Sequence, residues 1–234
     1  MLKQELRKLT KHVDGWLTDR EGELLYDLAS HCQRRGAIVE IGSWEGRSTI
    51  WLGHGSERGS GQPVYAIDPH ISPHHEIIGR DSTFDRFSRN IDEAGLGDTV
   101  IPVVKTSEAA AKEFDEPVEF IFIDGEHDYD SVSQDFALWF PKVIEGGIMA
   151  FHDTTRKMGP KRLVEERVFR SSSFRSVGVV DSITFCRKVA QNSALDRALN
   201  RLVLLRKHPA DAVKKLLPRP ARTMVTGILA RVRR

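Results

Sequence analysis

The chain has 234 residues, of which 40% are hydrophobic and 29% are charged. This composition is too apolar for a disordered chain and is typical of a folded protein with a sizeable core. It contains no apolar run of about 18 residues and no apolar secretion signal, so we expect no transmembrane helix and a cytoplasmic location. Cys32 and Cys186 match no metal or redox spacing and are expected to be reduced core thiols.

The net charge of +2 hides an asymmetry along the chain. Residues 189–234 hold eleven Lys or Arg and two Asp, a net charge of +9, which leaves −7 for the remainder. An acidic body with a basic tail indicates that the tail covers an acidic surface or has a partner of its own.

Two helices are predicted at the start of the chain, over residues 3–13 and 19–35. Thr18 and Glu21 have the spacing of a capping box for the second of them.

Short apolar segments rich in β-branched residues then alternate with segments of helical period. The predicted strands cover residues 37–41, 63–68, 100–104, 118–124 and 146–153, and the helices between them cover 44–53, 82–95, 106–114 and 130–140. Residues 174–181 and 182–189 follow each other almost directly and are expected to form an antiparallel hairpin at the sheet edge. The pattern predicts an α/β fold, a Rossmann-like sheet of about seven mostly parallel strands with an antiparallel last strand and helices on both faces.

We divide the chain into N-terminal helices (1–35), a core (36–189) and a basic amphipathic helical tail (190–234). The tail is expected to pack on an acidic face in a homodimer, with peripheral contact to an anionic membrane as the alternative. The apolar stripe and its basic flank are Val225, Ile228, Leu229 and Val232 with Arg222, Arg231, Arg233 and Arg234. Nucleic acid is disfavoured, because no aromatic residues are interleaved with the basic ones to stack on bases.

Ligands of such sheets bind at the carboxyl ends of the strands. The first predicted strand runs into EIGSWEGRST, in which Gly42 and Gly46 allow close backbone approach. Trp44 replaces the middle glycine of a dinucleotide fingerprint and Glu45 would face a pyrophosphate, so phosphate binding is disfavoured. The acidic Glu40 instead suits a ligand with an amino group.

The second predicted strand ends in Asp68, at a position where a carboxylate can accept both hydroxyls of a ribose. A ribose without a pyrophosphate points to S-adenosylmethionine. The stretches VEIGSWEGRSTIWL, VYAIDPH, VVKTSEAAAKE and FIDGEHDYDSVSQDFALWFPKVIEGGIMAFHDT resemble the successive motifs of class I S-adenosylmethionine-dependent methyltransferases. More narrowly, they resemble the metal-dependent branch that O-methylates sugars on macrolides and related glycans, over about residues 20–188.

The resemblance implies a set of cofactor-binding residues. Glu40, Gly42, Ser43 and Gly46 would line the methionine end, Asp68 the ribose and Ser107 the adenine edge, with Asp124 also next to the cofactor.

The resemblance also implies a divalent ion, Mg²⁺ or alternatively Mn²⁺, held by Asp124, His152 and Asp153, with His127 as the general base. His152 departs from the branch, which has Glu there, and imidazole is a poorer Mg²⁺ ligand than a carboxylate. His152 could instead orient Asp153 or contact substrate. Asp128 and Asp130 are expected to open the following helix, where negative charge meets its dipole.

The sequence therefore predicts a divalent-metal-assisted, S-adenosylmethionine-dependent O-methyltransferase acting on a hydroxyl of a sugar or glycosylated metabolite. One alternative is a metal-dependent O-methyltransferase of a catechol or other phenol. Another is a non-catalytic S-adenosylmethionine-binding scaffold recruited through its basic tail. Acceptor specificity is expected in the loops 69–82 and 154–162, and His70, His74 and His75 are expected to lie in a solvated loop.

Overall fold

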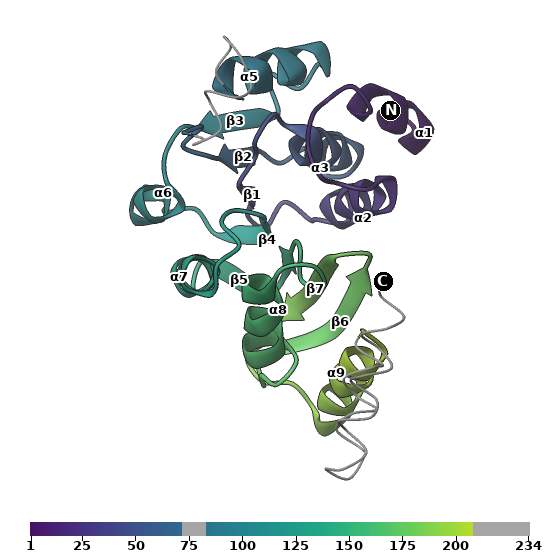
Figure 1. Cartoon of the computed structure of the whole chain (residues 1–234), viewed down its shortest axis with the longest axis vertical. Helices are drawn as coiled ribbons and strands as arrows, with labels where there is room; N and C mark the ends of the chain where they lie inside the picture. Colours follow the sequence, from purple (N-terminus) through teal and green to yellow (C-terminus); the bar gives the residue numbers. More distant parts are fainter. Residues whose placement is uncertain (72–82, 208–234) are drawn as a thin grey trace, which may run out of the picture.

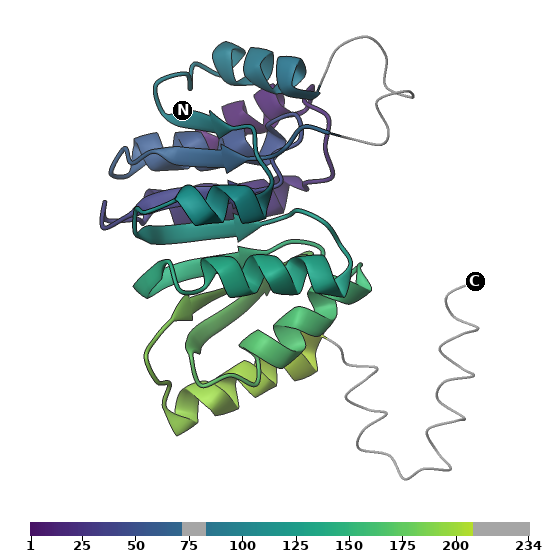
Figure 2. The same ribbon diagram turned by 90° about the vertical axis from the view of Figure 1, so that its left-hand side faces the viewer.

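The computed structural model describes residues 1–71 and 83–207, which form one seven-stranded sheet. Its order is β3-β2-β1-β4-β5-β7-β6, and the strands lie side by side along the long axis of the molecule (Figure 2). The strands are β1 (Ala37–Ile41), β2 (Val64–Ile67), β3 (Val100–Val103), β4 (Val118–Ile123), β5 (Val143–Phe151), β6 (Phe174–Val180) and β7 (Ile183–Lys188). Strands β1 to β5 are parallel, and β7 runs antiparallel to both β5 and β6. The predicted fold class is confirmed.

Helices cover both faces of the sheet (Figure 1). The side chains of α1 (Lys3–Thr10), α2 (Asp19–Ser30), α3 (Arg47–Arg58) and α5 (Thr83–Glu93) share one apolar core with the sheet. Those of α6 (Ser107–Glu113), α7 (Tyr129–Trp139), α8 (Met158–Leu163) and the π-helical turn η1 (Val164–Val168) form a second core on the other face. The last described helix, α9 (Ala194–Lys207), lies along β6 (Figure 1).

Strand β4 shows why the central strands are almost continuously apolar. All six of its residues are buried, and the apolar residues from 120 to 123 alternate between the two cores. Phe120 and Phe122 pack into the first core, whereas Ile121 and Ile123 pack into the second. A strand covered by helices on both sides has no solvent face on which to carry polar residues.

Several element boundaries differ from those predicted. The helix after β1 begins at Arg47 rather than 44, because Gly42, Trp44 and Gly46 have φ values of 83°, 47° and 92°, which no α-helix admits. Helix α8 occupies part of the segment 154–162 that was expected to be a loop. Helix α2 ends at Ser30 instead of 35.

Some predictions fall on residues outside the described ranges. They concern His74, His75 and the apolar and basic stripe from Arg222 to Arg234. The division of the chain into three parts and the homodimer stay predictions. Within the described ranges, no helix has both the length and the apolar character needed to cross a bilayer.

Candidate functional site

The loops after β1 and β4 meet where the winding of the sheet reverses, since β1 lies between β2 and β4. This is the place where open α/β sheets bind ligands. Gly42 is required there because a Cβ atom at this position would lie 2.3 Å from the carbonyl oxygen of Asp124. The close approach that the sequence predicted for this glycine is therefore made to the neighbouring loop of the protein.

Strained backbone gathers at this edge of the sheet. Trp44, His70 and Asp153 have φ values of 47°, 52° and 53°, and they follow β1, β2 and β5. Non-glycine residues in the left-handed region cost about 1–3 kcal/mol each and often accompany functional sites. Their shared location indicates that the carboxyl edge is shaped for function.

Asp68 organises the loop after β1. Its Oδ2 atom accepts hydrogen bonds from the backbone N–H groups of Ser43 and Trp44, at 3.0 and 2.9 Å, and its Oδ1 atom accepts one from His70 at 2.7 Å. Asp68, the residue predicted to bind the ribose, thus also fixes the loop in which the cofactor would lie. His70, expected in a solvated loop, is buried against Phe84 and Phe87.

The loop contains an orphaned donor that a ligand would satisfy. The Ser43 hydroxyl is buried and has no hydrogen-bond partner among the described residues. Buried polar groups in native proteins nearly always have a partner, so this hydroxyl fits a site that is completed by a bound polar molecule.

Glu40 lies beneath this loop, inside β1. It is fully buried, and its two oxygens accept hydrogen bonds from the hydroxyls of Ser48 and Thr49 at 2.5 Å each. Burial raises the pKa of Glu40 to about 8, although the two hydroxyls act in the opposite direction. The carboxyl group is therefore mostly protonated near neutral pH in the free protein.

Ser107 stands at the start of α6, apart from the loop after β1. Its hydroxyl accepts a hydrogen bond from the indole Nε1 of Trp139 at 2.9 Å, which ties α6 to α7. The side chain is half-buried. Its predicted contact with an adenine edge stays a prediction.

Asp124 directly follows β4, and its carboxylate is bound to His152, which directly follows β5. The Nδ1 atom of His152 lies 2.8 Å from Oδ1 of Asp124, and its Nε2 atom lies 3.5 Å from Oε2 of Glu21. The second contact is an ion pair rather than a well-formed hydrogen bond. Burial disfavours the charged ring, but the interactions with Asp124 and Glu21 outweigh it and raise the pKa of His152 to about 10.

His127 forms a second histidine–carboxylate pair beside the first. Its Nε2 atom lies 3.1 Å from Oδ2 of Asp153 and 3.9 Å from Oδ1 of Asp124. The hydrogen bond with Asp153 raises the pKa of His127. The side chain of His127 is 41% exposed, so a second molecule can reach it.

The predicted metal set does not fit this arrangement. Nδ1 of His152 is bound to Asp124, and Nε2, which has no hydrogen-bond partner among the described residues, faces the carboxylate of Glu21, so neither nitrogen points into an open site. In the described ranges, no three His, Cys, Asp or Glu side chains are disposed to hold a metal ion. His152 instead places a cationic ring between acidic groups.

The prediction that Asp128 and Asp130 open the helix after β4 is confirmed. Asp128 is the N-cap of α7, where its side chain accepts a hydrogen bond from the backbone of Ser131, and Asp130 lies in the first turn.

Sequence reasoning missed the second role of Glu21. Its spacing from Thr18 predicted the capping box, which the structure confirms. The contact with His152 joins positions 21 and 152, and no local pattern could have signalled it.

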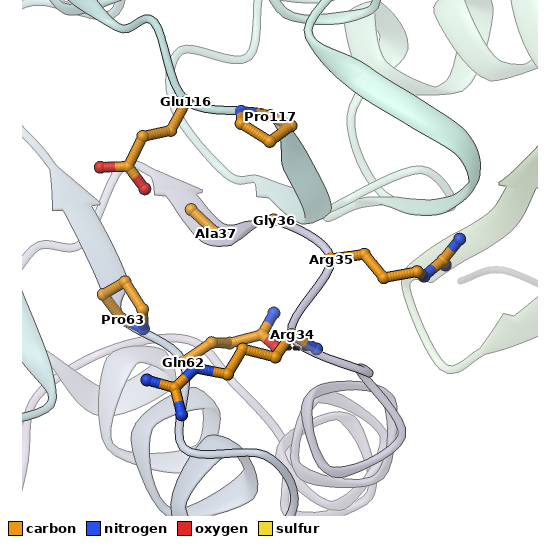
Figure 3. Close-up of a pocket in the computed structure, with 8 residues that line it drawn as sticks. All are labelled: Arg34, Arg35, Gly36, Ala37, Gln62, Pro63, Glu116 and Pro117. Carbon is orange, nitrogen blue, oxygen red and sulfur yellow. Dashed lines mark hydrogen bonds between the residues drawn. The ribbon is translucent and has the colours of Figure 1, made fainter.

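A surface hollow of about 280 Å³ lies at the other end of the sheet (Figure 3). It is lined by Arg34, Arg35, Gly36, Ala37, Gln62, Pro63, Glu116 and Pro117, next to the amino ends of β1, β2 and β4. It is therefore separate from the histidine–carboxylate pairs.

Residues 39–154 match a family model described as a methyltransferase domain. This range extends from β1 through the end of β5. It includes both histidine–carboxylate pairs but not Glu21, which also faces His152.

Solved structures share the fold at low identity. An O-methyltransferase from Bacillus cereus in complex with SAH is 20% identical, with a TM-score of 0.58, over 80% of this chain and 90% of that one. TomG, an O-methyltransferase from Streptomyces achromogenes involved in tomaymycin synthesis and solved with SAM, is 18% identical, with a TM-score of 0.57, over 80% and 88%. SAH-bound PaMTH1, a methyltransferase from Podospora anserina, is 16% identical, with a TM-score of 0.57, over 80% and 87%.

The family match and the sheet order agree with the sequence motifs. Residues 39–154 are therefore similar to a methyltransferase domain, on a sheet of the expected order.

Proposed function

We propose that the protein is an S-adenosylmethionine-dependent O-methyltransferase that methylates a hydroxyl of a sugar or glycosylated metabolite. The observation that carries the proposal is the half-exposed His127 ring, paired with Asp153 beside the loop after β1. Methyl transfer to oxygen needs a base for the hydroxyl proton, and this pair supplies one. The O-methyltransferases with SAM or SAH among the similar structures support the proposal, and the sugar acceptor follows from the motif resemblance.

The pairing with Asp153 supports a role for one atom of His127 as the proton acceptor. Since Nε2 faces Asp153, the neutral ring donates its Nε2–H to that carboxylate and keeps the lone pair on Nδ1. In this tautomer Nδ1 is the ring nitrogen that can accept the proton of a hydroxyl, and the side chain is 41% exposed. Asp153 then stabilises the imidazolium that forms when Nδ1 takes the proton.

The reaction is an in-line displacement. The acceptor oxygen forms a bond to the methyl carbon while the bond from that carbon to the sulfonium sulfur breaks, and sulfur keeps the electron pair. The hydroxyl proton passes to His127. Because the sulfonium is already activated, the protein's task is to position the two molecules and to receive this proton.

The resemblance also implies metal assistance. A divalent ion bound to the hydroxyl would act as a Lewis acid and lower its pKa. The predicted ligand set does not fit such an ion, and turnover after removal of divalent metal distinguishes the two mechanisms.

The test is a methylation assay with S-adenosylmethionine and a panel of glycosylated metabolites, free sugars, catechols and amines, with products identified by mass spectrometry. Methylation of a sugar hydroxyl is expected. His127→Ala is expected to lower turnover by about 10²- to 10⁴-fold with little change in cofactor affinity. His12→Ala, which removes an exposed histidine on the N-terminal segment, is the matched control.

Methylation of catechols but not of sugars would indicate that the acceptor is a phenol. Cofactor binding without turnover on any hydroxylated acceptor would favour the scaffold. Wild-type turnover in His127→Ala would contradict its assignment as the base.

A further inference from the structure

Glu21 is a fully buried carboxylate on α2, outside the residues that match the methyltransferase family. As a capping-box residue it needs only to accept one backbone N–H, which it can do at the protein surface. A buried carboxylate is costly unless it is paired and hydrogen-bonded. Capping alone therefore does not account for its burial.

The contacts of Glu21 satisfy both oxygens. Oε1 accepts hydrogen bonds from the backbone N–H and the hydroxyl of Ser182, at 2.8 and 2.5 Å, and Oε2 accepts one from the backbone N–H of Thr18 at 2.8 Å. Ser182 lies in the turn between β6 and β7. Two segments outside the matched domain thus hold the carboxylate in place, with Oε2 toward Nε2 of His152.

The His152 ring is confined on every side that the structure describes. Its side chain is 3% exposed, its edge packs against the ring of Phe122 with centroids 6.0 Å apart, and its two nitrogens face Glu21 and Asp124. The ring is hydrogen-bonded to Asp124 at Nδ1 and ion-paired with Glu21 at Nε2, which favours one orientation, and that orientation fixes the Asp124 oxygen that lies 3.9 Å from His127.

We propose that Glu21 is a positioning residue for methyl transfer: acting through His152, it holds the carboxylate of Asp124 beside the base His127. This inference rests on the proposed function for its catalytic consequence, whereas the Glu21–His152–Asp124 chain itself is a property of the folded protein. Helix α2 and the β6–β7 turn, which lie outside the residues matched by the family model, then complete the reaction site.

The test compares Glu21→Gln with Thr18→Ala. The first removes the charge that faces His152, and the second weakens the same helix end but leaves the carboxylate and its backbone bond from residue 18. Glu21→Gln is expected to lower kcat by about 10- to 100-fold, with the acceptor KM and the cofactor Kd within about twofold of wild type. Thr18→Ala is expected to lower the melting temperature while kcat stays within about twofold of wild type.

A second readout needs no acceptor. The ring ¹⁵N and ¹H resonances of His152, measured by NMR on the full chain, are expected to shift in Glu21→Gln and to stay in place in Thr18→Ala. Equal kcat in the two variants, or unchanged His152 resonances in Glu21→Gln, would overturn the proposal. If the wild-type protein methylates no hydroxyl at all, the proposed function fails, and the resonances still decide whether Glu21 fixes the ring.

Ser182→Ala serves if Glu21→Gln does not fold. It leaves the carboxylate and removes one hydroxyl donor to it. A smaller fall in kcat together with a shift of the His152 resonances is expected. Wild-type kcat with unchanged resonances would contradict the proposal.

Discussion

The carboxylate of Asp153 lies 3.1 Å from Nε2 of His127, and Asp153 adopts a left-handed backbone with φ of 53° directly after β5. The strained backbone and the pairing concern the same residue. Strain of this kind persists only where the surrounding structure enforces it, and here it accompanies the orientation of a carboxylate toward a base.

Turnover is expected to rise with pH and to level off above neutrality. A base works only when it is unprotonated, and the hydrogen bond with Asp153 raises the pKa of His127 above its usual value. The rising limb of the pH profile is therefore expected above about pH 6.5, the ordinary pKa of histidine. Initial rates with both substrates saturating, from about pH 5.5 to 9, measure it.

Asp153→Asn is expected to move this limb to lower pH, because the variant removes the charge that stabilises the imidazolium. Its plateau should also fall, since the ring is no longer held with Nδ1 open. A limb that stays at the wild-type pH would show that another group titrates.

Asp68→Ala is expected to weaken cofactor binding more than about tenfold. The carboxylate accepts three backbone N–H groups, two from the loop after β1 and one from His70, and their loss releases the loop. Calorimetric titration with S-adenosylhomocysteine measures the change. Asp98→Ala, which removes an exposed aspartate before β3, is the control, and equal affinity in the two variants would contradict the role of Asp68.

The sheet and most of its helices were predictable because their signals are local. Strands such as β4 are apolar at all but one position since both faces are covered, and the Asp128 cap precedes its helix directly. The predicted start of α3 is wrong because the positive φ values at Trp44 and Gly46 depend on how the loop packs. Helix propensity does not contain this information.

The site was predictable only in part. The acids and histidines at the strand ends are visible in the sequence because parallel strands bring their carboxyl ends to one edge. Their pairing was not visible. The sequence predicts His152 as a metal ligand. Its partner Glu21 lies 131 positions away on a helix, where the local sequence predicts only a cap.

Glu40 is expected to make stability depend on pH. Its pKa is raised by burial to about 8 in the folded protein, above the value of 4.5 for the exposed group. Folding thus favours the protonated form, so this group begins to cost stability as pH rises above 4.5 and the cost is complete above about pH 8. The shift corresponds to roughly 5 kcal/mol.

The comparison with Glu40→Gln isolates this effect from that of other groups. The unfolding free energy of the variant relative to wild type, from urea titrations, should increase between about pH 5 and pH 9. A difference that stays constant over this range would mean that Glu40 is ionised in the folded protein.

Removal of divalent metal is expected to leave turnover within about twofold of wild type, because both nitrogens of His152 are engaged by Asp124 and Glu21 and the remaining carboxylates are paired with histidines. The measurement is turnover after dialysis against chelator, followed by addition of Mg²⁺ or Mn²⁺. Loss of activity that either ion restores would reinstate the metal-assisted mechanism and would require His152 to leave its two carboxylates. In that case Asp124→Asn should abolish the restoration, whereas Asp98→Ala should not.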